Sequence, residues 1–512
     1  MSTPRSRKIF AFLILALWAA VVAAHVKREY YKPMALRLEE GARAIAPGSH
    51  IYAVRMGERT IGMATTRLDT IATGFVLEDM LSMDVPALGR VHRAIATTQV
   101  ELGRALDLKR FRFALQSEVG RFTVTGSATP DSLLELEIEA GGEPERSRVR
   151  LDPDLTLDAL LASRIAAAGQ LEVGREVTGR LFDPAVMEVR ETVVRVVAHD
   201  TILVPDSVNW DADAERYIPV HHDTVPVWQL EQRLGGLVVT SWVDEDGRLV
   251  RAESPLGLTL ERTEFELARQ EWRAAGEDAA LAAGYGAIIE TTAVASNVAL
   301  DSAAALDRLR VRLHGVTLEG LDLAGGRQAL AGDTLTVERE ASLEAGYTLP
   351  YAGGGEAAQE LGATPLVQSN DPRIVRAARR IAGGETDPVA VARRLNEWVY
   401  ARLAKDIVAS VPSAVQVLEA RKGDCNEHTV LYVALARALG LPARTAAGLV
   451  HVNGQFYYHA WPEVWLDGRW VAVDPTLGQF PADASHLRLV VGGLARQVEL
   501  VLLIGRLRLE VL

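Results

Sequence analysis

The chain has a single cysteine, Cys425, among its 512 residues. One thiol cannot form an intramolecular disulfide, and it excludes zinc and iron–sulfur sites built from several cysteines. Long basic runs are also absent, and 55 lysines and arginines stand against 67 aspartates and glutamates, a net charge of −12. A nucleic-acid-binding surface is therefore not expected. The mean hydropathy of +0.07 is too low for a protein with many membrane spans.

The amino terminus does contain one apolar segment. Residues 9–26 read IFAFLILALWAAVVAAHV and follow Arg5, Arg7 and Lys8. This pattern is typical of a secretory signal or of a single membrane anchor. We expect residues 1–30 to be an uncleaved signal anchor or transmembrane helix, with the bulk of the chain exported into a periplasmic or other extracytoplasmic space. Signal-peptide cleavage after the small residues at 22–24 is the alternative.

Residues 45–270 carry the signals of a β-rich domain. Residues 134–139 alternate apolar and charged side chains with a period of two, as a half-buried strand does. Strand patterns flank Asp246-Gly247, which is a hairpin signal. Within this region, residues 86–102 and 155–168 show helical patterns. No chemistry can be read from the region, so its role and its partner stay unknown.

The run His221-His222-Asp223 resembles part of a metal site. Adjacent residues on a strand point to opposite faces, so two neighbouring histidines rarely bind one ion. No third ligand has a supporting spacing. We therefore expect a solvated strand end here and no metal site.

Two segments separate the β-rich region from the C-terminal part. Residues 274–286 are rich in alanine and glycine and are expected to form a linker. Residues 286–345 resume short strand patterns, which predict a small β module or an extension of the first domain. Residues 370–512 are expected to form the C-terminal domain, and its most informative residues lie between 412 and 490.

A helix is predicted to begin at Cys425. Asp424 suits the N-cap, and Glu427 completes an acidic version of the capping box. The apolar residues between 430 and 439 predict a buried helix, which Gly440 ends. Cys425 thus falls in the first turn, where free backbone N–H groups and the helix dipole favour the thiolate.

Three strands are expected after this helix, at 443–450, 455–466 and 469–474. A two-residue turn at Asp467-Gly468 pairs positions whose numbers sum to 935. His459 and Asp474 then become diagonal neighbours on one face, at a spacing that an imidazole and a carboxylate can bridge.

Cys425, His459 and Asp474 together are the residue types of a thiol acyl-transfer site. The thiolate is the nucleophile, the imidazole takes and returns a proton, and the carboxylate orients the ring. Each residue alone has a simpler structural explanation, such as inert packing for a buried cysteine. Their order, at a helix start and on a hairpin, favours a catalytic site.

The motifs around these residues resemble the core of the transglutaminase-like superfamily, in its bacterial membrane-anchored form. They are GDC at 423–425, ARALGLPAR at 436–444, HAWPEV at 459–464 and WVAVDPT at 470–476. The resemblance covers roughly residues 370–490, about a quarter of the chain. It implies an α+β, papain-like core in which the helix bearing the cysteine packs on an antiparallel sheet.

The resemblance also implies roles for the three residues and a class of reaction. Cys425 is then the nucleophile, His459 the general base and acid, and Asp474 the orienting group. The implied reaction is acyl transfer on protein or peptide amides through a thioester. A cysteine peptidase or amidase that hydrolyses peptide or cell-envelope amide bonds is one alternative. A non-catalytic envelope binding scaffold is another. No cofactor or metal is required by this scheme.

Other residues near the motifs receive separate predictions. Tyr457 and Trp461 each lie two residues from His459 on the same predicted strand, so their side chains share its face. Both are candidates for the substrate cleft, although core packing explains Trp461 equally well. Ser413 and Gln416 are polar candidates for a second oxyanion donor.

Three charged or titratable neighbours have weaker assignments. Glu463 is expected to pair with an arginine such as Arg444. A metal pair of His428 with the cysteine is disfavoured because two ligands make a poor site. His486 is given no role.

Overall fold

The structure is a computed structural model of the whole chain. It describes residues 33–512 except 88–89, 235–236, 256, 283–292, 295, 299, 301–302, 341 and 407–409. The predicted signal anchor at residues 1–30 lies outside the described residues, so it stays a prediction. Within the described part of the chain, no helix combines the length and the apolar character that a membrane span needs.

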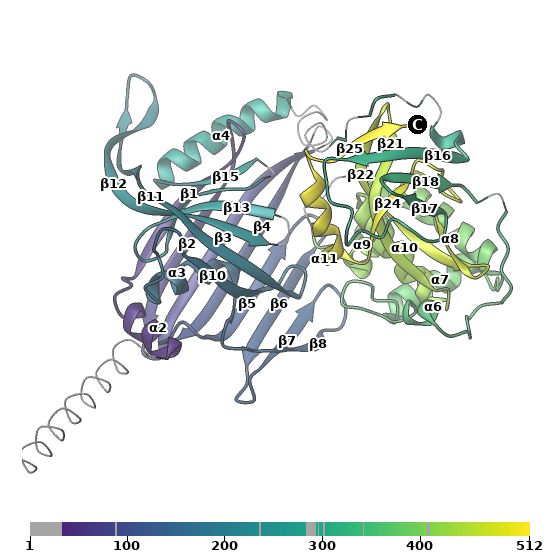
Figure 1. The fold of residues 1–512 in the computed structure, drawn as a ribbon, viewed down its shortest axis with the longest axis horizontal. Coiled ribbons are helices and arrows are strands. Elements are labelled where there is room, and N and C mark those ends of the chain that lie inside the picture. The colour runs from purple at the N-terminus through teal and green to yellow at the C-terminus, as the bar shows by residue number, and fades with distance from the viewer. Residues whose placement is uncertain are drawn as a thin grey trace, which may run out of the picture.

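The described residues form a β-rich domain, residues 33–282, and a C-terminal domain, residues 293–512. Figure 1 shows the two domains side by side, with the purple and blue strands of the first next to the green and yellow elements of the second. This arrangement agrees with the predicted α+β architecture with a β-rich part first.

The β-rich domain is built on one sheet, which has fifteen strands in the described residues. In spatial order the sheet runs from β8 through β1 to β15 and on to β9, so strands next to each other in the chain are mostly next to each other in the sheet. The strands are β1 (Gly48–Met56), β2 (Arg59–Ile71), β3 (Gly74–Ala87), β4 (Arg90–Gly103), β5 (Leu108–Gln116), β6 (Arg121–Ala128), β7 (Leu133–Glu139), β8 (Glu145–Arg150), β9 (Leu155–Thr156), β10 (Glu176–Asp183), β11 (Glu188–Asp211), β12 (Arg216–Leu234), β13 (Leu237–Val243), β14 (Leu249–Glu253) and β15 (Leu258–Thr263).

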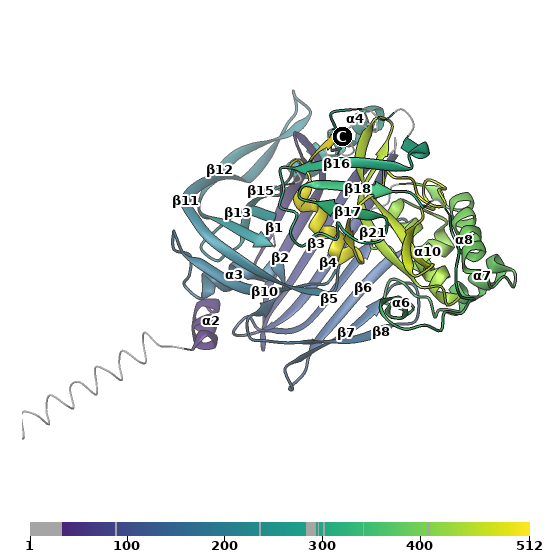
Figure 2. The same ribbon diagram turned by 45° about the vertical axis from the view of Figure 1, so that its right-hand side comes forward.

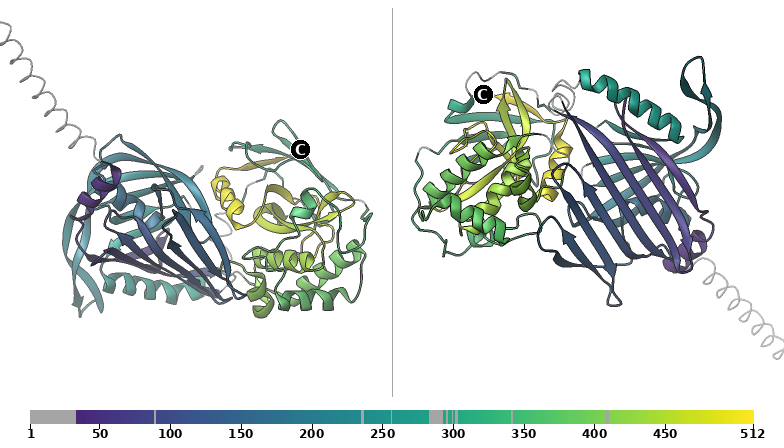
Figure 3. Two further views of the ribbon diagram at one scale, coloured as in Figure 1. Left: turned by 90° about the horizontal axis from the view of Figure 1, so that it is seen from below. Right: turned by 180° about the vertical axis from the view of Figure 1, so that it is seen from behind.

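The sheet curls so that its two halves face each other. Figure 2 and the left view of Figure 3 show β10 to β13 crossing over the inner face of β2 to β5. Alternation along the strands places one set of apolar side chains inside this curl, including the buried Phe111, Phe182 and Leu134. A cavity remains between the two halves.

Three helices complete this domain: α2 (Met34–Ala42), α3 (Asp158–Ala167) and α4 (Phe265–Ala282). Leu160 of α3 packs into the core inside the curl. Ala268 of α4 packs instead against Ala53 and Met63 of the first two strands. The two helices therefore cover different parts of the sheet.

Two predictions for this region are wrong. The predicted helix at 86–102 is strand β4, which pairs with β3 and β5 along its length. Its valine, isoleucine and threonine residues suit a strand, and pairing on both edges overrides the local helical pattern. The predicted linker at 274–286 continues helix α4 as far as Ala282, because alanine and glutamate are good helix formers. Its remaining residues lie outside the described part.

The core of the C-terminal domain packs four helices against an antiparallel sheet with the strand order β23-β22-β21-β24. Helix α10 lies among the other three and contributes buried residues such as Leu431 and Tyr432. The elements are α7 (Pro372–Ala382), α8 (Pro388–Arg402), α9 (Ala414–Ala420), α10 (Cys425–Ala438), β21 (Ala443–Val452), β22 (Gln455–Leu466), β23 (Arg469–Ala472) and β24 (Leu487–Val491).

A second small sheet, in the order β17-β18-β16-β25, belongs to the same domain. Its last strand comes from the C-terminal end of the chain and pairs with β16. Its apolar side chains share a core with Leu449 and Phe456 of the first sheet. The segment predicted as a small β module or extension, 286–345, is thus joined to the C-terminal domain. The strands are β16 (Arg308–His314), β17 (Gln328–Ala331), β18 (Thr334–Glu338) and β25 (Arg508–Val511).

Short elements connect these layers. They are the helices α6 (Glu356–Gln359) and α11 (Leu494–Gln497), the 3₁₀ helices η1 (Ala303–Ala305) and η2 (Val498–Leu503), and the two-residue strands β19 (Ala404–Lys405) and β20 (Lys422–Gly423). Strand β20 directly precedes the N-cap of α10, and its parallel pairing with β19 fixes the start of that helix.

Buried polar contacts hold the two domains together. Gln368 donates from Nε2 to the carbonyl oxygen of Ala140, 3.0 Å away, and accepts a hydrogen bond from Ser413. Val119 of the β-rich domain packs into the helical core of the C-terminal domain. The interface therefore has both a hydrophobic and a hydrogen-bonded part.

Candidate active site

Helix α10 begins at the cysteine, as predicted. The Asp424 carboxylate accepts a hydrogen bond from the Asn426 amide at 2.8 Å, and Glu427 accepts one from the Asp424 amide at 2.9 Å. Both halves of the capping box are present. This cap holds Cys425 in the first turn of a helix whose other turns are buried.

The surroundings of the thiol differ from the expectation of a resting thiolate. Burial raises the pKa of Cys425 well above its ordinary value, and the negative charge of Asp424 adds to that shift. A hydrogen bond from the Ala460 backbone acts in the opposite direction and is outweighed. The resting cysteine is therefore a neutral thiol, because desolvation and nearby carboxylates outweigh the helix N-terminus.

His459 and Asp474 are in direct contact. Nε2 of His459 lies 2.8 Å from Oδ2 of Asp474. The register predicted from the turn holds from Leu466 and Arg469 to Glu463 and Ala472. The strand pairing ends there, and Asp474 reaches the histidine from the following turn. The contact with Asp474 uses Nε2 of the ring, and the backbone of Ala460, the neighbour of His459, hydrogen-bonds to the Cys425 sulfur.

The Asp474 carboxylate is fully buried and saturated with donors. Its Oδ1 accepts from the amides of Thr476 at 2.7 Å and Leu477 at 2.9 Å. Its Oδ2 accepts from His459 and from a second histidine, His486, at 2.9 Å. Burial alone would raise the pKa of Asp474, but the charges and hydrogen bonds of the two histidines hold it well below its usual range.

His486 is a buried neighbour of the candidate site that sequence reasoning missed. It is fully buried, with Nε2 on Asp474 and Nδ1 3.1 Å from Oδ1 of Asp483. Burial lowers the pKa of His486, but the two carboxylates overcome this effect and raise it. The sequence signal was weak, because His486 follows a loop whose path back to Asp474 depends on the fold.

Trp461 does not wall a cleft. It is 1% exposed and packs with Ala446, Ala472 and Ala482. Its ring stacks on His459 at 6.2 Å between centroids. The cleft prediction for Trp461 is therefore wrong: it supports the histidine from within the core. Tyr457 lies half-buried on the same strand, and its cleft role stays a prediction.

The two oxyanion candidates lie elsewhere. Ser413 is completely buried and donates to Gln368 and to the Ala140 carbonyl. Gln416 donates to the carbonyl of Arg121, 2.6 Å away. Both residues hold the domain interface, so the prediction of an oxyanion role is wrong for each. In the sequence, only their polar side chains suggested an oxyanion role, and a place in a domain interface explains polar side chains equally well.

Three further residues have structural partners. His428 places Nδ1 2.7 Å from the Asp424 carbonyl oxygen, one turn back along the helix. Glu463 accepts from Arg444 at 2.8 Å, as the sequence predicts. Arg488 adds a second ion pair to Glu463, at 3.0 Å.

The histidine run at 221–222 lies within the long β11–β12 hairpin. His221 is exposed and contacts Asp206 at 2.8 Å, and Asp223 is close to both. His222 is on the adjacent position and so points to the opposite face. An exposed group of this kind is common without an ion, so we assign no metal here.

A family comparison covers the same part of the chain. Residues 375–475 match the family model of the transglutaminase-like superfamily. The match contains Cys425, His459 and Asp474, so the predicted resemblance is confirmed for this region. It supports a cysteine-dependent enzyme in general terms, and from here on we call residues 293–512 the transglutaminase-like domain.

Similarities to other proteins are distant. No curated protein matches the chain. A candidate cysteine protease from Cytophaga hutchinsonii is 15% identical with a TM-score of 0.28, over 40% of this chain and 81% of that chain. A β-barrel-like domain of unknown function from Brucella abortus is 14% identical with a TM-score of 0.31, over 43% and 94%.

Proposed function

We propose that the transglutaminase-like domain catalyses acyl transfer from protein or peptide amides. Cys425 is the nucleophile, His459 the acid and base, and Asp474 the orienting group. The observation that carries the proposal is the 2.8 Å contact between His459 and Asp474. It commits Nε2 of the ring and leaves Nδ1 for the thiol, whose sulfur is hydrogen-bonded by the next residue along the strand.

The steps follow from a neutral resting thiol. His459 takes the thiol proton at Nδ1 as the sulfur attacks the carbonyl carbon. The tetrahedral intermediate collapses when the imidazolium returns the proton to the departing amine or ammonia, which leaves a thioester. An incoming amine then attacks the thioester, gives its proton to His459, and the sulfur leaves and regains that proton. Asp474 stabilises the imidazolium in each half of the cycle.

The test uses the full chain with two acyl donors. p-Nitrophenyl acetate reports acylation of the thiol, and benzyloxycarbonyl-Gln-Gly with dansylcadaverine reports amine incorporation and ammonia release. We expect an acetyl group on Cys425 by mass spectrometry, and loss of both reactions in Cys425→Ala. Cys425→Ser, which keeps the size and the hydrogen bond, should be nearly as inactive.

The outcomes separate the alternatives. Ammonia release without incorporated amine would indicate hydrolysis, as in a cysteine peptidase or amidase. No acylation in the wild type would indicate a binding scaffold. Acylation that survives Cys425→Ala would contradict the proposed nucleophile.

The exported location is a proposal that the apolar run at 9–26 and its basic flank support. Alkaline phosphatase fused after residue 512 tests it in a bacterial host, because that enzyme is active only when exported. An inactive fusion with full expression would place the domain in the cytoplasm. The substrate is then a protein or peptide of the cell envelope.

A further inference from the structure

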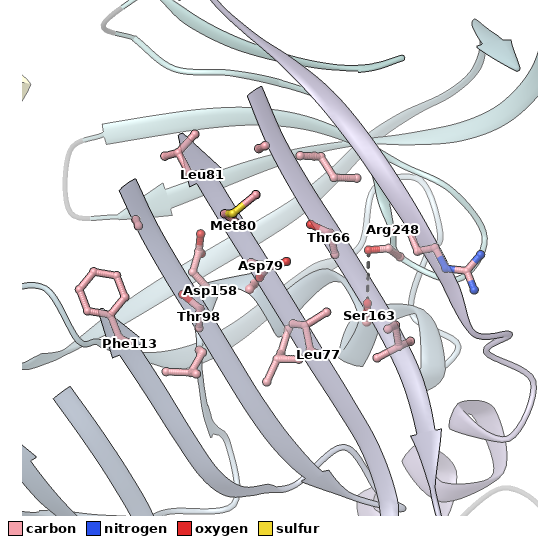
Figure 4. A pocket seen from close by; sticks show the side chains of 18 of the residues that line it. Thr66, Leu77, Asp79, Met80, Leu81, Thr98, Phe113, Asp158, Ser163 and Arg248 are labelled. Carbon is pink, nitrogen blue, oxygen red and sulfur yellow. Dashed lines mark hydrogen bonds between the residues drawn. The ribbon is translucent and has the colours of Figure 1, made fainter. Parts of the chain in front are cut away.

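The β-rich domain contains a partly open cavity that the proposed chemistry does not use. Its volume is about 590 Å³, within the range of small-molecule sites. The wall comes from both halves of the curled sheet and from helix α3 (Figure 4). Apolar side chains dominate it, among them Leu68, Leu77, Phe113, Leu160 and Phe182.

A row of polar residues crosses this apolar wall. His50, Thr66, Asp79 and Thr98 are paired in register across β1, β2, β3 and β4, and all four line the cavity. Figure 4 shows Thr66, Asp79 and Thr98 on their adjacent strands. The same-face rows on either side are apolar, as the pairs of Leu68 with Leu77 and of Ala64 with Leu81 show.

Two polar atoms of this row have no hydrogen-bond partner in the described part of the chain. Oδ1 of Asp79 and Nε2 of His50 make no hydrogen bond with the described residues. Burial raises the pKa of Asp79 to about 6, and a hydrogen bond from Thr66 offsets this only in part. A buried carboxylate without a counter-charge is costly, so its ionised form needs a cation from the cavity.

Other charged groups around the cavity do not supply that cation. Arg248 pairs with Asp246 at 3.1 Å and with the Ala46 carbonyl. Arg190 donates toward Ala495 of the other domain. His50 is neutral, since burial and two arginines lower its pKa to about 4.

Further carboxylates also face the cavity. Asp158 of α3 lines it beside Asp183 of β10, and burial raises the pKa of Asp158. Asp158 accepts a hydrogen bond from Gln232 at 2.7 Å and keeps accessible surface. The cavity wall is therefore mainly apolar and also carries carboxylates.

The geometry points to a binding site for an amphiphile with a single alkyl chain and an ammonium head group. The chain lies against the apolar rows, and the head group donates to Asp79, Thr66 and Thr98. A methylene is close to a water molecule in size, about 30 Å³, so the cavity has room for roughly twenty heavy atoms. This accommodates a twelve-carbon amine.

The test uses the full chain in phosphatidylcholine nanodiscs and two photoreactive probes. One is dodecylamine and the other dodecanoic acid, each with a diazirine in mid-chain, and labelled residues are mapped by mass spectrometry. We expect the amine to label β2, β3, β4 and α3, with competition from unlabelled dodecylamine. Acidification from pH 7.5 to 5 should weaken labelling by about tenfold, because Asp79 becomes protonated while the amine stays charged.

Variants make the test specific. Asp79→Asn should weaken amine labelling by about tenfold, whereas Glu78→Gln, the exposed neighbour on the opposite face, should leave it unchanged. Ala96→Phe fills the cavity and should abolish labelling even if Asp79→Asn fails to fold. Equal labelling by the acid probe, or labelling that persists in Ala96→Phe, would overturn the proposal.

Discussion

His486 donates to the Asp474 carboxylate from within the core, with 2.9 Å between Nε2 and Oδ2. The same carboxylate oxygen contacts His459. One oxygen of Asp474 thus interacts with both the proposed catalytic histidine and a buried histidine. The proposed triad is extended inward to Asp483, whose carboxylate bonds the other nitrogen of His486.

His486 is expected to act as a positioning residue for the proposed reaction. In His486→Gln the amide can still donate to Asp474, but the positive charge is lost, so Asp474 stabilises the His459 imidazolium more strongly. A more stable imidazolium gives its proton less readily to the departing amine, so we expect kcat to fall about tenfold with little change in KM, and the acidic limb of the kcat/KM profile to move to higher pH. His221→Gln, an exposed histidine, is the control. An unchanged pH profile with reduced kcat would mean that His486 is only a packing residue.

The pH dependence of stability should report the Asp474 network. The pKa of Asp474 is held below its unfolded value, so its contribution is present above about pH 4 and is lost as the pH falls further. Asp474→Asn should therefore lower the free energy of unfolding at pH 7, with a difference from wild type that shrinks toward pH 3. Urea unfolding at several pH values measures it. Asp467→Asn, in an exposed turn, should show no such trend, and a difference that is constant with pH would contradict the assignment.

The reactivity of the thiol should reflect its burial. We expect the iodoacetamide alkylation rate of Cys425 to rise with an apparent pKa above the free-thiol value of about 8.5, because desolvation and Asp424 oppose the thiolate. Asp424→Asn keeps a good N-cap and should lower this pKa. Asp467→Asn again serves as the control. An apparent pKa well below 8.5 that depends on His459 would instead demonstrate a preformed ion pair.

The domain interface depends on Gln368. This buried side chain donates to the Ala140 carbonyl and accepts from Ser413 and from the Val415 amide. Gln368→Ala leaves the Val415 amide without this partner, and Ser413 and the Ala140 carbonyl each lose one of two hydrogen bonds. We expect a loss of about 1–3 kcal/mol in the free energy of unfolding. Gln455→Ala, at an exposed position, should change it little. Equal urea midpoints for the two variants would show that the interface is held by packing alone.

Local sequence rules were sufficient for the start of α10. Capping at Asp424 and Glu427 depends on residues three positions apart, so the position of Cys425 at the first turn could be read directly. The Asp467-Gly468 turn likewise defined the β22–β23 register. The alternation of side chains along one strand placed His459 and Trp461 on a common face. That alternation does not distinguish a residue that lines a cleft from one that lies in the core.

Features that depend on distant segments could not be read in this way. Strand β4 has a helical pattern in isolation and becomes a strand because β3 and β5 pair with both of its edges. The polar roles of Ser413 and Gln416 depend on a second domain nearly three hundred residues earlier in the chain. The raised pKa of the thiol likewise follows from burial, which no local motif reports.

The sequence by itself determined the residue types of the proposed site, the helix start that carries the cysteine and the hairpin that carries the histidine, because these depend on short-range capping and turn chemistry. Only the tertiary structure decided that His486 contacts Asp474, that Trp461 lies in the core and that the β-rich domain contains a cavity with a polar row. Those features require segments far apart in the chain to meet, and their energies come from desolvation and packing.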